Sequence, residues 1–299
     1  MKMQVLCTMC IKNNKLFEKI ILFLLIVFSV NGCKQQNNSL YQLSNQSYSQ
    51  MMSYILHYDD KTIVVDGGTN DDEEYLINQI EKISGNNTVD AWFITHYHKD
   101  HTGALTQYLS NNDKKIQIKK VYYNFPNEKW VEENESNRLN DIKMINNQID
   151  KVSSQIIKTG DRIKIGNIVI DVLRVFNPLI TNNAGNNSSS VFKFSINDIN
   201  ILFLGDLGVE GGEGLLKNNK DAIANMTYVQ MAHHGQAGVN EDVYQVINPK
   251  YCLWPTTDWL WENKDGAYKT DETKEWIGKL NVKKNYIAKD GTISISLDK

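Results

Sequence analysis

The chain has 299 residues, 41% of them hydrophobic and 22% charged, and a formal net charge of −3. This length suits one large α/β domain or two small ones. The acidic balance gives no support to general electrostatic capture of nucleic acid, which requires a basic face, and leaves only a local basic groove as a route to it.

The N-terminal segment has the features of a secretory signal. Three lysines, Lys12, Lys15 and Lys19, precede or adjoin an apolar run from Ile20 to Phe28. The run is shorter than the about 20 residues of a membrane span, and the Gly32-Cys33 that follows resembles the lipobox of bacterial lipoproteins. We therefore predict a signal peptide over residues 1–32, lipidation of Cys33, attachment to the membrane through that lipid and an extracytoplasmic location. A retained N-terminal anchor is the alternative. Removal of residues 1–32 takes away four lysines and one glutamate and moves the formal charge from −3 to −6.

Residues 33–49 are rich in Gln, Asn and Ser and lack an apolar period, which predicts a flexible tether. We place the folded domain at residues 50–299. It opens with a predicted hairpin over residues 51–65 that brings Asp66 to the end of a strand. Asp66 is either a turn residue or a hydrogen-bonding support for a metal loop. His57 lies on this hairpin, where packing is favoured over a ligand role.

The stretch from Ala91 to Leu105 contains the strongest signal. After a helix predicted over residues 71–84, an apolar strand ends at a polar cluster with His96, His98, Asp100 and His101. Five of the six histidines of the chain fall in two clusters, this one and His233-His234. Imidazole and carboxylate are ligands that suit zinc, so the clustering predicts a metal site over the alternative of surface histidines on a turn.

The second half of the chain adds two more strand ends with ligand-type residues. A long helix is predicted over residues 134–157, followed by two strands within residues 161–176 that form a hairpin and by a polar loop over residues 177–190. The apolar strand over residues 199–204 then ends in Gly205-Asp206, and the strand over residues 229–232 ends in His233-His234-Gly235. Strands resuming after the helix predict two sheets packed face to face.

The ordered set of His96-x-His98-x-Asp100-His101, Gly205-Asp206 and His233-His234-Gly235 resembles the metallo-β-lactamase superfamily over nearly all of the chain after the tether. The resemblance implies an αββα four-layer sandwich with a dinuclear zinc site at one edge of the sheets, manganese or iron being the alternative metals. It implies that His96 and His98 hold one ion, that Asp100 and His101 hold the other, and that Asp206 bridges them. One of His233 and His234 would complete the second site, and the other would bind the first ion or act on the leaving group.

Metal activation of a water is the chemistry that this ligand set implies, because two ions stabilise both attacking and leaving oxygens. Within that scheme Asp100 and His234 are the candidate catalytic residues.

The chain departs from the superfamily pattern because no histidine occurs between His101 and His233. A loop rich in Asn and Ser stands there instead, which resembles the subgroup that contains the hydrolase domain of competence-type DNA-uptake channels and some phosphocholine esterases. Asn187, Ser188 and Ser190 are candidate contacts to a phosphoryl oxygen, with a solvated loop as the alternative.

Trp259 is a further candidate contact, through stacking on a base or enclosure of a quaternary ammonium. Core capping is favoured for it, since large aromatic side chains dominate core burial.

These observations predict an extracytoplasmic, metal-dependent hydrolase that acts on phosphodiester bonds of a nucleic acid or a phosphocholine-type substrate. Hydrolysis of a lactone or β-lactam is one alternative, and a non-catalytic surface-binding lipoprotein that retains the fold is the other.

Overall fold

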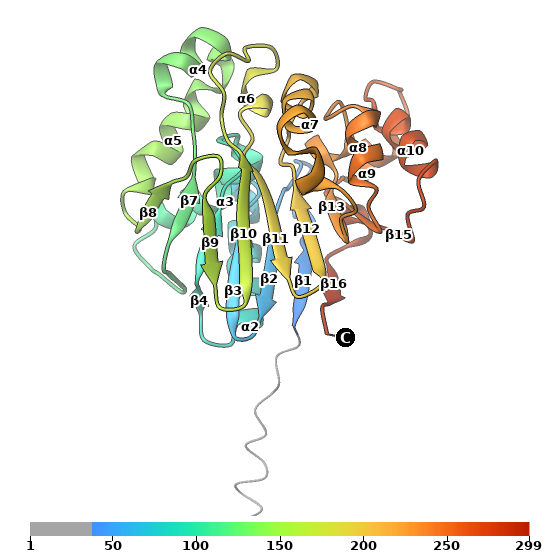
Figure 1. Ribbon diagram of the computed structural model, residues 1–299. Coiled ribbons are helices and arrows are strands. Elements are labelled where there is room, and N and C mark those ends of the chain that lie inside the picture. Colours follow the sequence, from blue (N-terminus) through green and yellow to red (C-terminus); the bar gives the residue numbers. More distant parts are fainter. Residues whose placement is uncertain (1–37, 299) are drawn as a thin grey trace, which may run out of the picture. The chain divides into compact units, whose positions relative to one another are not determined.

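The computed structural model describes residues 38–298, and within them two seven-stranded sheets pack face to face with helices on their outer sides (Figure 1). The predicted αββα sandwich is therefore confirmed. The predicted signal peptide and the lipidated Cys33 lie outside the described residues. Within residues 38–298, no helix has the length and apolar character needed to cross a membrane.

The first sheet has the strand order β16-β1-β2-β3-β5-β7-β8. In that order its strands are Ile293–Ser296, Ser39–Gln42, Tyr54–Tyr58, Lys61–Val65, Ala91–Phe93, Val121–Tyr123 and Ser154–Ile156. On its outer side lie the helices α2 (Glu73–Ser84), α3 (Lys99–Ser110), α4 (Glu128–Asn134) and α5 (Leu139–Ile149), with the short η1 (Asn70–Asp72) and η2 (Ser136–Arg138). A small separate pair consists of β4 (Thr88–Val89) and β6 (Gln117–Ile118).

The second sheet has the order β15-β14-β13-β12-β11-β10-β9. In that order its strands are Lys284–Ile287, Tyr251–Trp254, Tyr228–Gln230, Ile199–Phe203, Val191–Ile196, Ile168–Arg174 and Arg162–Ile165. The helices that accompany it are α6 (Ala184–Asn187), α7 (Val209–Ile223), α8 (Glu241–Ile247), α9 (Asp258–Glu262) and α10 (Thr270–Gly278), with the short η3 (Ala232–Gly235) and η4 (Ala288–Asp290).

Alternation along the strands explains the layers. In β5, Phe93 packs into the core between the two sheets, while its neighbour Trp92 packs under α2 and α3. In β12, Phe203 faces the same central core and Leu202 faces α7 and α8. Successive side chains of a strand point to opposite faces, so a strand covered on both sides is apolar throughout. Both strands are therefore buried and rigid, and both end at the same edge of the sandwich.

Two boundary predictions are wrong. The predicted tether contains β1, which pairs with both β2 and β16. Leu40 is fully buried, and the buried Gln42 side chain donates hydrogen bonds to the carbonyls of Trp254 and Tyr286. The helix predicted over residues 134–157 is shorter, because α5 ends at Ile149 and residues 154–156 form β8. The apolar period of the helix ran on into the strand, which hid the boundary between them.

Candidate metal centre

Several strand ends bring ligand-type side chains to one edge of the sandwich. β3 is parallel to β5, and β12, β13 and β14 are parallel to one another, so within each group the carboxyl ends lie at the same edge. Asp66 follows β3, His96 follows β5, Asp206 follows β12 and His233 follows β13. A backbone hydrogen bond from Ser190 to the carbonyl of Thr95, at 2.8 Å, joins the two sheets at this edge. The topology thus assembles residues that are more than a hundred positions apart.

Four ligand-type side chains at this edge converge on one point: ligand atoms of Asp100, His101, Asp206 and His234 all lie within 4.8 Å of one another. The Nε2 atom of His101 is 3.2 Å from Oδ1 of Asp206, and Nε2 of His234 is 3.2 Å from Oδ2 of Asp100. Both histidines are fully buried. The structure therefore brings together the predicted set for the second ion and selects His234 as its second histidine.

Asp66 orients His101. Its carboxylate accepts hydrogen bonds from the Thr95 backbone N–H and hydroxyl, both at 2.8 Å, and from Nδ1 of His101 at 2.9 Å. Since an ionised carboxylate only accepts, Nδ1 of His101 carries a proton, and Nε2 is the atom that faces Asp206 and is open to a second proton or to a metal. This is the carboxylate–histidine arrangement that supports metal ligands, so Asp66 has the supporting role rather than that of a simple turn residue.

His96 and His234 are oriented in the same way. The hydroxyl proton of Thr95 goes to Asp66, so this oxygen accepts from Nδ1 of His96, which lies 3.2 Å away. Nδ1 of His234 donates to the carbonyl of Pro255 at 2.8 Å. Nε2 of His96 is left with its lone pair and lies 4.0 Å from Oδ2 of Asp206, while Nε2 of His234 faces Oδ2 of Asp100 at 3.2 Å.

The loop of Asp206 is built by hydrogen bonds that the sequence motif does not reveal. Gly205 has a φ of 58°, a left-handed conformation that favours glycine. The buried Gln230 side chain accepts from the Leu204 and Gly205 backbone N–H groups and donates to the Gly205 carbonyl at 3.0 Å. The Ser189 hydroxyl accepts from the backbone N–H of Asp206 at 3.0 Å. These contacts fix the direction of the Asp206 carboxylate.

His98 stands apart from the cluster. Its Nε2 atom lies 3.0 Å from Oε2 of Glu135, and the same oxygen accepts the Tyr97 hydroxyl proton at 2.5 Å. The Glu135 carboxylate therefore occupies the Nε2 side of the His98 ring, and His98 is not among the residues whose ligand atoms lie within 4.8 Å of one another. The predicted site of the first ion, with His96 and His98 as its ligands, is therefore not brought together, whereas the predicted ligands of the second ion are.

Gly185 packs directly over this His98–Glu135 contact. A Cβ atom at position 185 would overlap both His98 Nε2 and Glu135 Oε2. The sequence offered no motif for Glu135, which follows α4 in a polar segment. Only the arrangement of α4 and α6 next to the loop of His98 makes its role visible.

His233 lies at the mouth of the site. Its side chain is 20% exposed, and Nε2 is 3.9 Å from Oδ2 of Asp206 and 3.4 Å from the amide nitrogen of Asn186. His233 and His234 have φ values of 49° and 55°, a conformation uncommon for residues other than glycine. Strain of this kind persists where the surrounding structure enforces it. It turns two adjacent imidazoles toward the same metal edge.

The polar loop before β11 supports the scaffold. The Asn187 side chain donates to the carbonyl of Asn182 and to Glu210, and accepts from the backbone N–H groups of Gly208 and Gly211 at the start of α7. The Ser188 hydroxyl donates to the carbonyl of Gly185. Ser190 is fully buried. The side chains of Asn187 and Ser188 are thus used by the fold, and Ser190 is enclosed in it, so the contacts to substrate predicted at these three residues stay a prediction.

Trp259 is also placed differently from the favoured prediction. It lies on α9 outside the three buried cores. Its ring stacks on Tyr48 with centroids 5.6 Å apart, and the Tyr48 side chain is 80% exposed. The core-capping interpretation does not fit Trp259. His57, in contrast, is buried and hydrogen-bonded to the Thr62 hydroxyl at 3.0 Å, as expected for a packing residue.

Burial and neighbouring charges have opposite effects on the pKa values of His101 and Asp206. Burial favours neutral imidazole, but the carboxylates of Asp206 and Asp66 outweigh it and raise the pKa of His101 well above its usual value. For His96, burial and then the neighbouring charges of His101 and His98 lower the pKa well below the usual value. Burial likewise favours a neutral Asp206, but the charges of His101 and His234 hold its pKa well below the usual range. A proton on His101 thus competes with any cation for the same ligands.

The donor set fits a divalent metal ion. Nε2 of His96, Nε2 of His101 and Oδ1 of Asp206 are buried without a hydrogen-bond partner in the described part of the chain. Buried polar atoms without partners are costly and rare. Two nitrogen lone pairs and a carboxylate oxygen turned toward one another are a donor set that zinc or iron takes. A metal held there would be bound by Asp100, His101, Asp206 and His234, with His96 adjacent.

Comparisons with known proteins agree with this geometry. Residues 49–251, more than half of the chain, match the sequence profile of the Metallo-beta-lactamase superfamily. The chain belongs to this superfamily. No curated protein matches it significantly.

Solved structures share the fold at low sequence identity. The metallo-beta-lactamase fold protein YhfI from Bacillus subtilis superposes with a TM-score of 0.52 at 12% identity, over 86% of this chain and 100% of that one. CmlA, a diiron beta-hydroxylase from Streptomyces venezuelae, superposes with a TM-score of 0.54 at 10% identity, over 88% of this chain and 55% of that one. The chain thus spans about half the length of CmlA. These likenesses concern the fold.

Proposed function

We propose that this protein is an extracytoplasmic, metal-dependent hydrolase that cleaves phosphodiester bonds. The observation that carries the proposal is the convergence of Asp100, His101, Asp206 and His234 within 4.8 Å, at a surface hollow with two cationic side chains. The extracytoplasmic location rests on the signal-like N-terminal sequence alone.

The hollow has a volume of about 340 Å³, and Asp100 and His233 from the metal centre contribute to its lining together with Lys99 and Arg138. Lys99 makes no ion pair with another residue of the 38–298 segment, while Arg138 shares its charge with Asp141 at 3.4 Å. Cationic side chains beside a metal suit the oxygens of a phosphoryl group, which carry negative charge through the reaction. A neutral lactone has no such charge for them to bind.

A divalent metal at this site would act as a Lewis acid and would make a water available as nucleophile near neutral pH. In hydrolysis of a phosphodiester, the oxygen of a water would form a bond to phosphorus, the bond from phosphorus to the leaving oxygen would break, and the proton that the water loses would pass to the leaving oxygen. His233 is better placed for this proton transfer than His234, because it is partly exposed and lines the hollow while His234 is fully buried among ligands.

The donor set indicates a class of metal, the divalent ions that bind nitrogen and carboxylate ligands. Nitrogen and carboxylate ligands suit zinc, iron and manganese, and the CmlA fold relative is named as a diiron enzyme. We propose zinc as the first choice.

A substrate panel tests the proposal. Metal-loaded protein is assayed with bis-p-nitrophenyl phosphate, p-nitrophenylphosphocholine, single-stranded DNA, a lactone and a chromogenic cephalosporin. We expect turnover of phosphodiesters and its loss in Asp206→Ala. Turnover of the cephalosporin or the lactone alone would replace the proposed substrate class. The absence of any metal-dependent turnover would favour the non-catalytic binding lipoprotein.

A further inference from the structure

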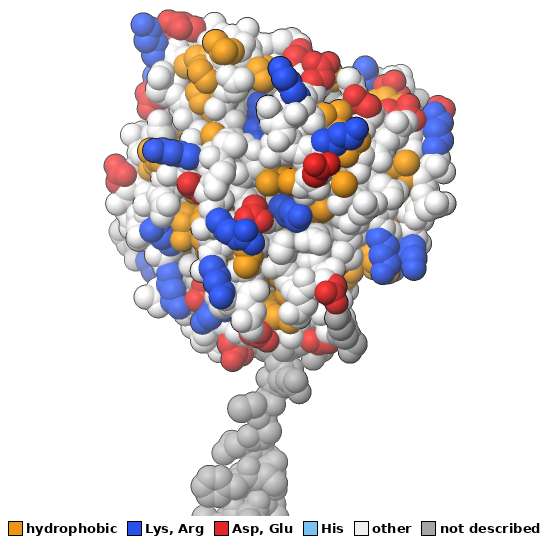
Figure 2. Space-filling view, in the orientation of Figure 1, with side chains coloured by type: hydrophobic (Ala, Val, Ile, Leu, Met, Phe, Trp, Pro, Cys, Tyr) orange, Lys and Arg blue, Asp and Glu red, His pale blue; other side chains and the backbone are white. Residues whose placement is uncertain are grey.

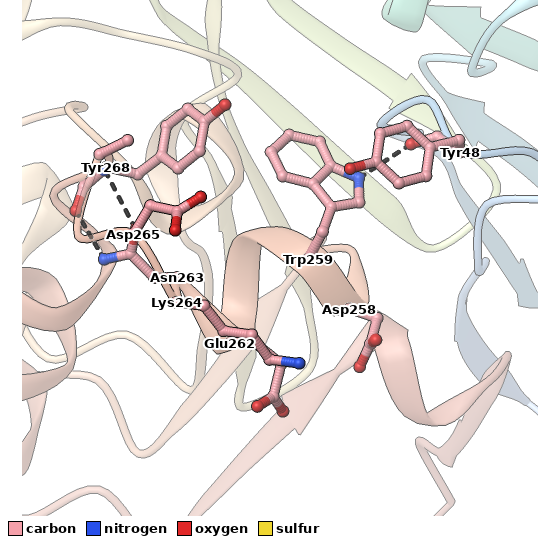
Figure 3. A pocket seen from close by; sticks show the side chains of 9 residues that line it. Tyr48, Asp258, Trp259, Glu262, Asn263, Lys264, Asp265 and Tyr268 are labelled. Carbon is pink, nitrogen blue, oxygen red and sulfur yellow. Dashed lines mark hydrogen bonds between the residues drawn. The ribbon is translucent and has the colours of Figure 1, made fainter.

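We infer that a cavity next to the metal-site hollow binds the positively charged ammonium end of the substrate. The cavity is about 320 Å³ and is formed mainly by α9 and the loop after it (Figure 3). This volume lies at the lower end of the roughly 300–1,000 Å³ typical of small-molecule sites. The inference rests on the proposed function for the phosphodiester itself and adds the chemistry of its substituent.

Three aromatic rings form one wall. Trp259 stands between Tyr48, whose ring stacks on it, and Tyr268, whose ring is tilted by 57° at a centroid distance of 5.4 Å. The indole N–H of Trp259 donates to the carbonyl of Tyr48 at 2.8 Å, which fixes its orientation (Figure 3). The side chains of Tyr48 and Tyr268 are 80% and 41% exposed. Such a cluster of accessible rings offers the negative π faces that attract a cation.

The remaining lining of the cavity is acidic. Asp258, Glu262 and Asp265 contribute three carboxylates, against the single positive charge of Lys264. Lys289 is the other cation that acts on Asp258 and Glu262. Asp265 has no ion pair or side-chain hydrogen bond with any other residue from 38 to 298. Its carboxylate lies beside the Tyr268 ring in Figure 3. Aromatic faces combined with carboxylates are the chemistry that recognises an organic ammonium ion.

The two hollows adjoin. Trp259 and Tyr268 line both the acidic cavity and the hollow that contains Asp100 and His233. A substrate with its phosphoryl group at the metal centre, near Lys99, would place an adjoining substituent toward these two rings. The metal-site hollow has cationic side chains and the adjoining cavity has carboxylates. The pair of hollows therefore matches a zwitterionic phosphodiester, with its negative phosphoryl group in the first and its ammonium group in the second.

The same charges argue against a nucleic acid strand. Stacked aromatic rings accept nucleobases as well, but the next phosphate of a strand would approach the carboxylates of Asp258, Glu262 and Asp265. Figure 2 shows acidic and basic side chains interspersed on the face it presents, over the second sheet, whereas strand binding uses a positively charged groove along the backbone.

The helix that carries Trp259 already contains one cation–π contact. The Lys274 ammonium lies 4.4 Å from the centroid of the Trp261 ring. Trp261 is thus occupied by a cation of the chain itself, and it provides the matched control for Trp259, two residues away on α9.

Choline and its neutral isostere 3,3-dimethylbutan-1-ol serve as probes. Isothermal titration calorimetry of the metal-loaded protein is expected to detect choline binding and at least about tenfold weaker binding of the isostere. Trp259→Leu should weaken choline binding about tenfold, equivalent to about 1.4 kcal/mol. Trp259→Phe should restore most of it, and Asp265→Asn should weaken it severalfold. Glu133, an exposed carboxylate on α4 that pairs with Lys129 and does not line the cavity, provides a second control. The variants Trp261→Phe and Glu133→Gln should bind choline as the wild type does.

Kinetics provide a second readout. In Trp259→Leu, kcat/KM for p-nitrophenylphosphocholine should fall about tenfold relative to kcat/KM for bis-p-nitrophenyl phosphate. Equal binding of choline and the isostere, or tighter binding of adenosine than of choline at Trp259, would overturn the inference. Because the calorimetry needs no turnover, the two proposals fail separately. Phosphodiester hydrolysis without choline binding refutes the ammonium site alone, and choline binding without hydrolysis refutes the hydrolase alone.

Discussion

Replacing Asp66 by Asn should weaken metal binding without disrupting the fold. Asn has the same shape and tolerates the φ of 56° at this position, and its amide oxygen retains the hydrogen bond from the Thr95 backbone N–H. The amide nitrogen then faces Nδ1 of His101, where the carboxylate had accepted. Two donors cannot pair, so the His101 proton moves to Nε2 and the lone pair turns away from Asp206.

The expected size of the effect follows from this tautomer change. Loss of a hydrogen-bonding partner of a metal ligand typically costs about 10- to 100-fold in metal affinity, or about 1.4–2.7 kcal/mol. Asp66 is also one of the charges that raise the pKa of His101. In the wild type a proton on His101 competes with the metal as the pH falls toward and below that raised pKa, and in the variant this competition weakens. The affinity deficit of Asp66→Asn should therefore be larger at pH 8 than at pH 6.

Zinc affinity is measured by competition with a fluorescent chelator at both pH values. Asp90→Asn is the matched control, because Asp90 also accepts a backbone hydrogen bond, from Thr62 at 3.0 Å, but lies away from the metal centre. Thermal unfolding of the metal-free proteins checks that both variants fold. Zinc affinity of Asp66→Asn equal to that of Asp90→Asn would refute the proposed orientation of His101.

Three further predictions concern other parts of the structure. Glu135→Ala frees His98, so zinc bound per chain at saturation should rise above the wild-type value by mass spectrometry of the intact protein; an unchanged ratio would show that Glu135 does not withhold His98. Burial raises the pKa of the Cys252 thiol to about 12, so Cys252 should resist iodoacetamide at pH 8.5 until the protein unfolds. Because the thiol ionises first in the unfolded chain, the free energy of unfolding should decline above pH 9, by at most about 1.4 kcal/mol per pH unit. The Cys252→Ala variant would lack that decline, and rapid alkylation of the folded wild type would contradict it. Gln42→Ala should destabilise the fold by about 2–4 kcal/mol in urea unfolding, since it leaves the buried Tyr54 hydroxyl without its acceptor. A change below about 0.5 kcal/mol would show that β1 does not stabilise the folded domain.

The metal ligands were predictable because their signal is local. His96, Asp100 and His101 lie within six residues, and Asp206 and His234 each follow an apolar strand that can be recognised by its length. Parallel strands place such residues at one edge. The αββα class followed from the same strand ends together with the superfamily resemblance.

The residues that position these ligands were not predictable in the same way. Glu135 and Gln230 lie in segments without a motif, and their roles arise only where the chain packs. Asn187 is the opposite case. Its place in a polar loop suggested a substrate contact, but its side chain satisfies the start of α7. Polar composition does not distinguish a solvated loop from one whose side chains are consumed by backbone groups.

The strand β1 was missed for a related reason. Residues 33–49 are polar overall, and only Leu40 and Leu43 are fully buried apolar residues in the described part of this segment. A four-residue strand that gains its stability from pairing with β2 and β16 on its two sides has no period of its own to recognise. The partner strand β16 lies at the other end of the chain.

Metal content is the most direct test of the account. Protein that lacks residues 1–32 is saturated with zinc, dialysed against metal-free buffer and measured by inductively coupled plasma mass spectrometry, beside Asp206→Ala. We predict at least one zinc per chain in the wild type and a large loss in the variant. A folded wild-type protein that retains far less than one metal per chain would contradict it.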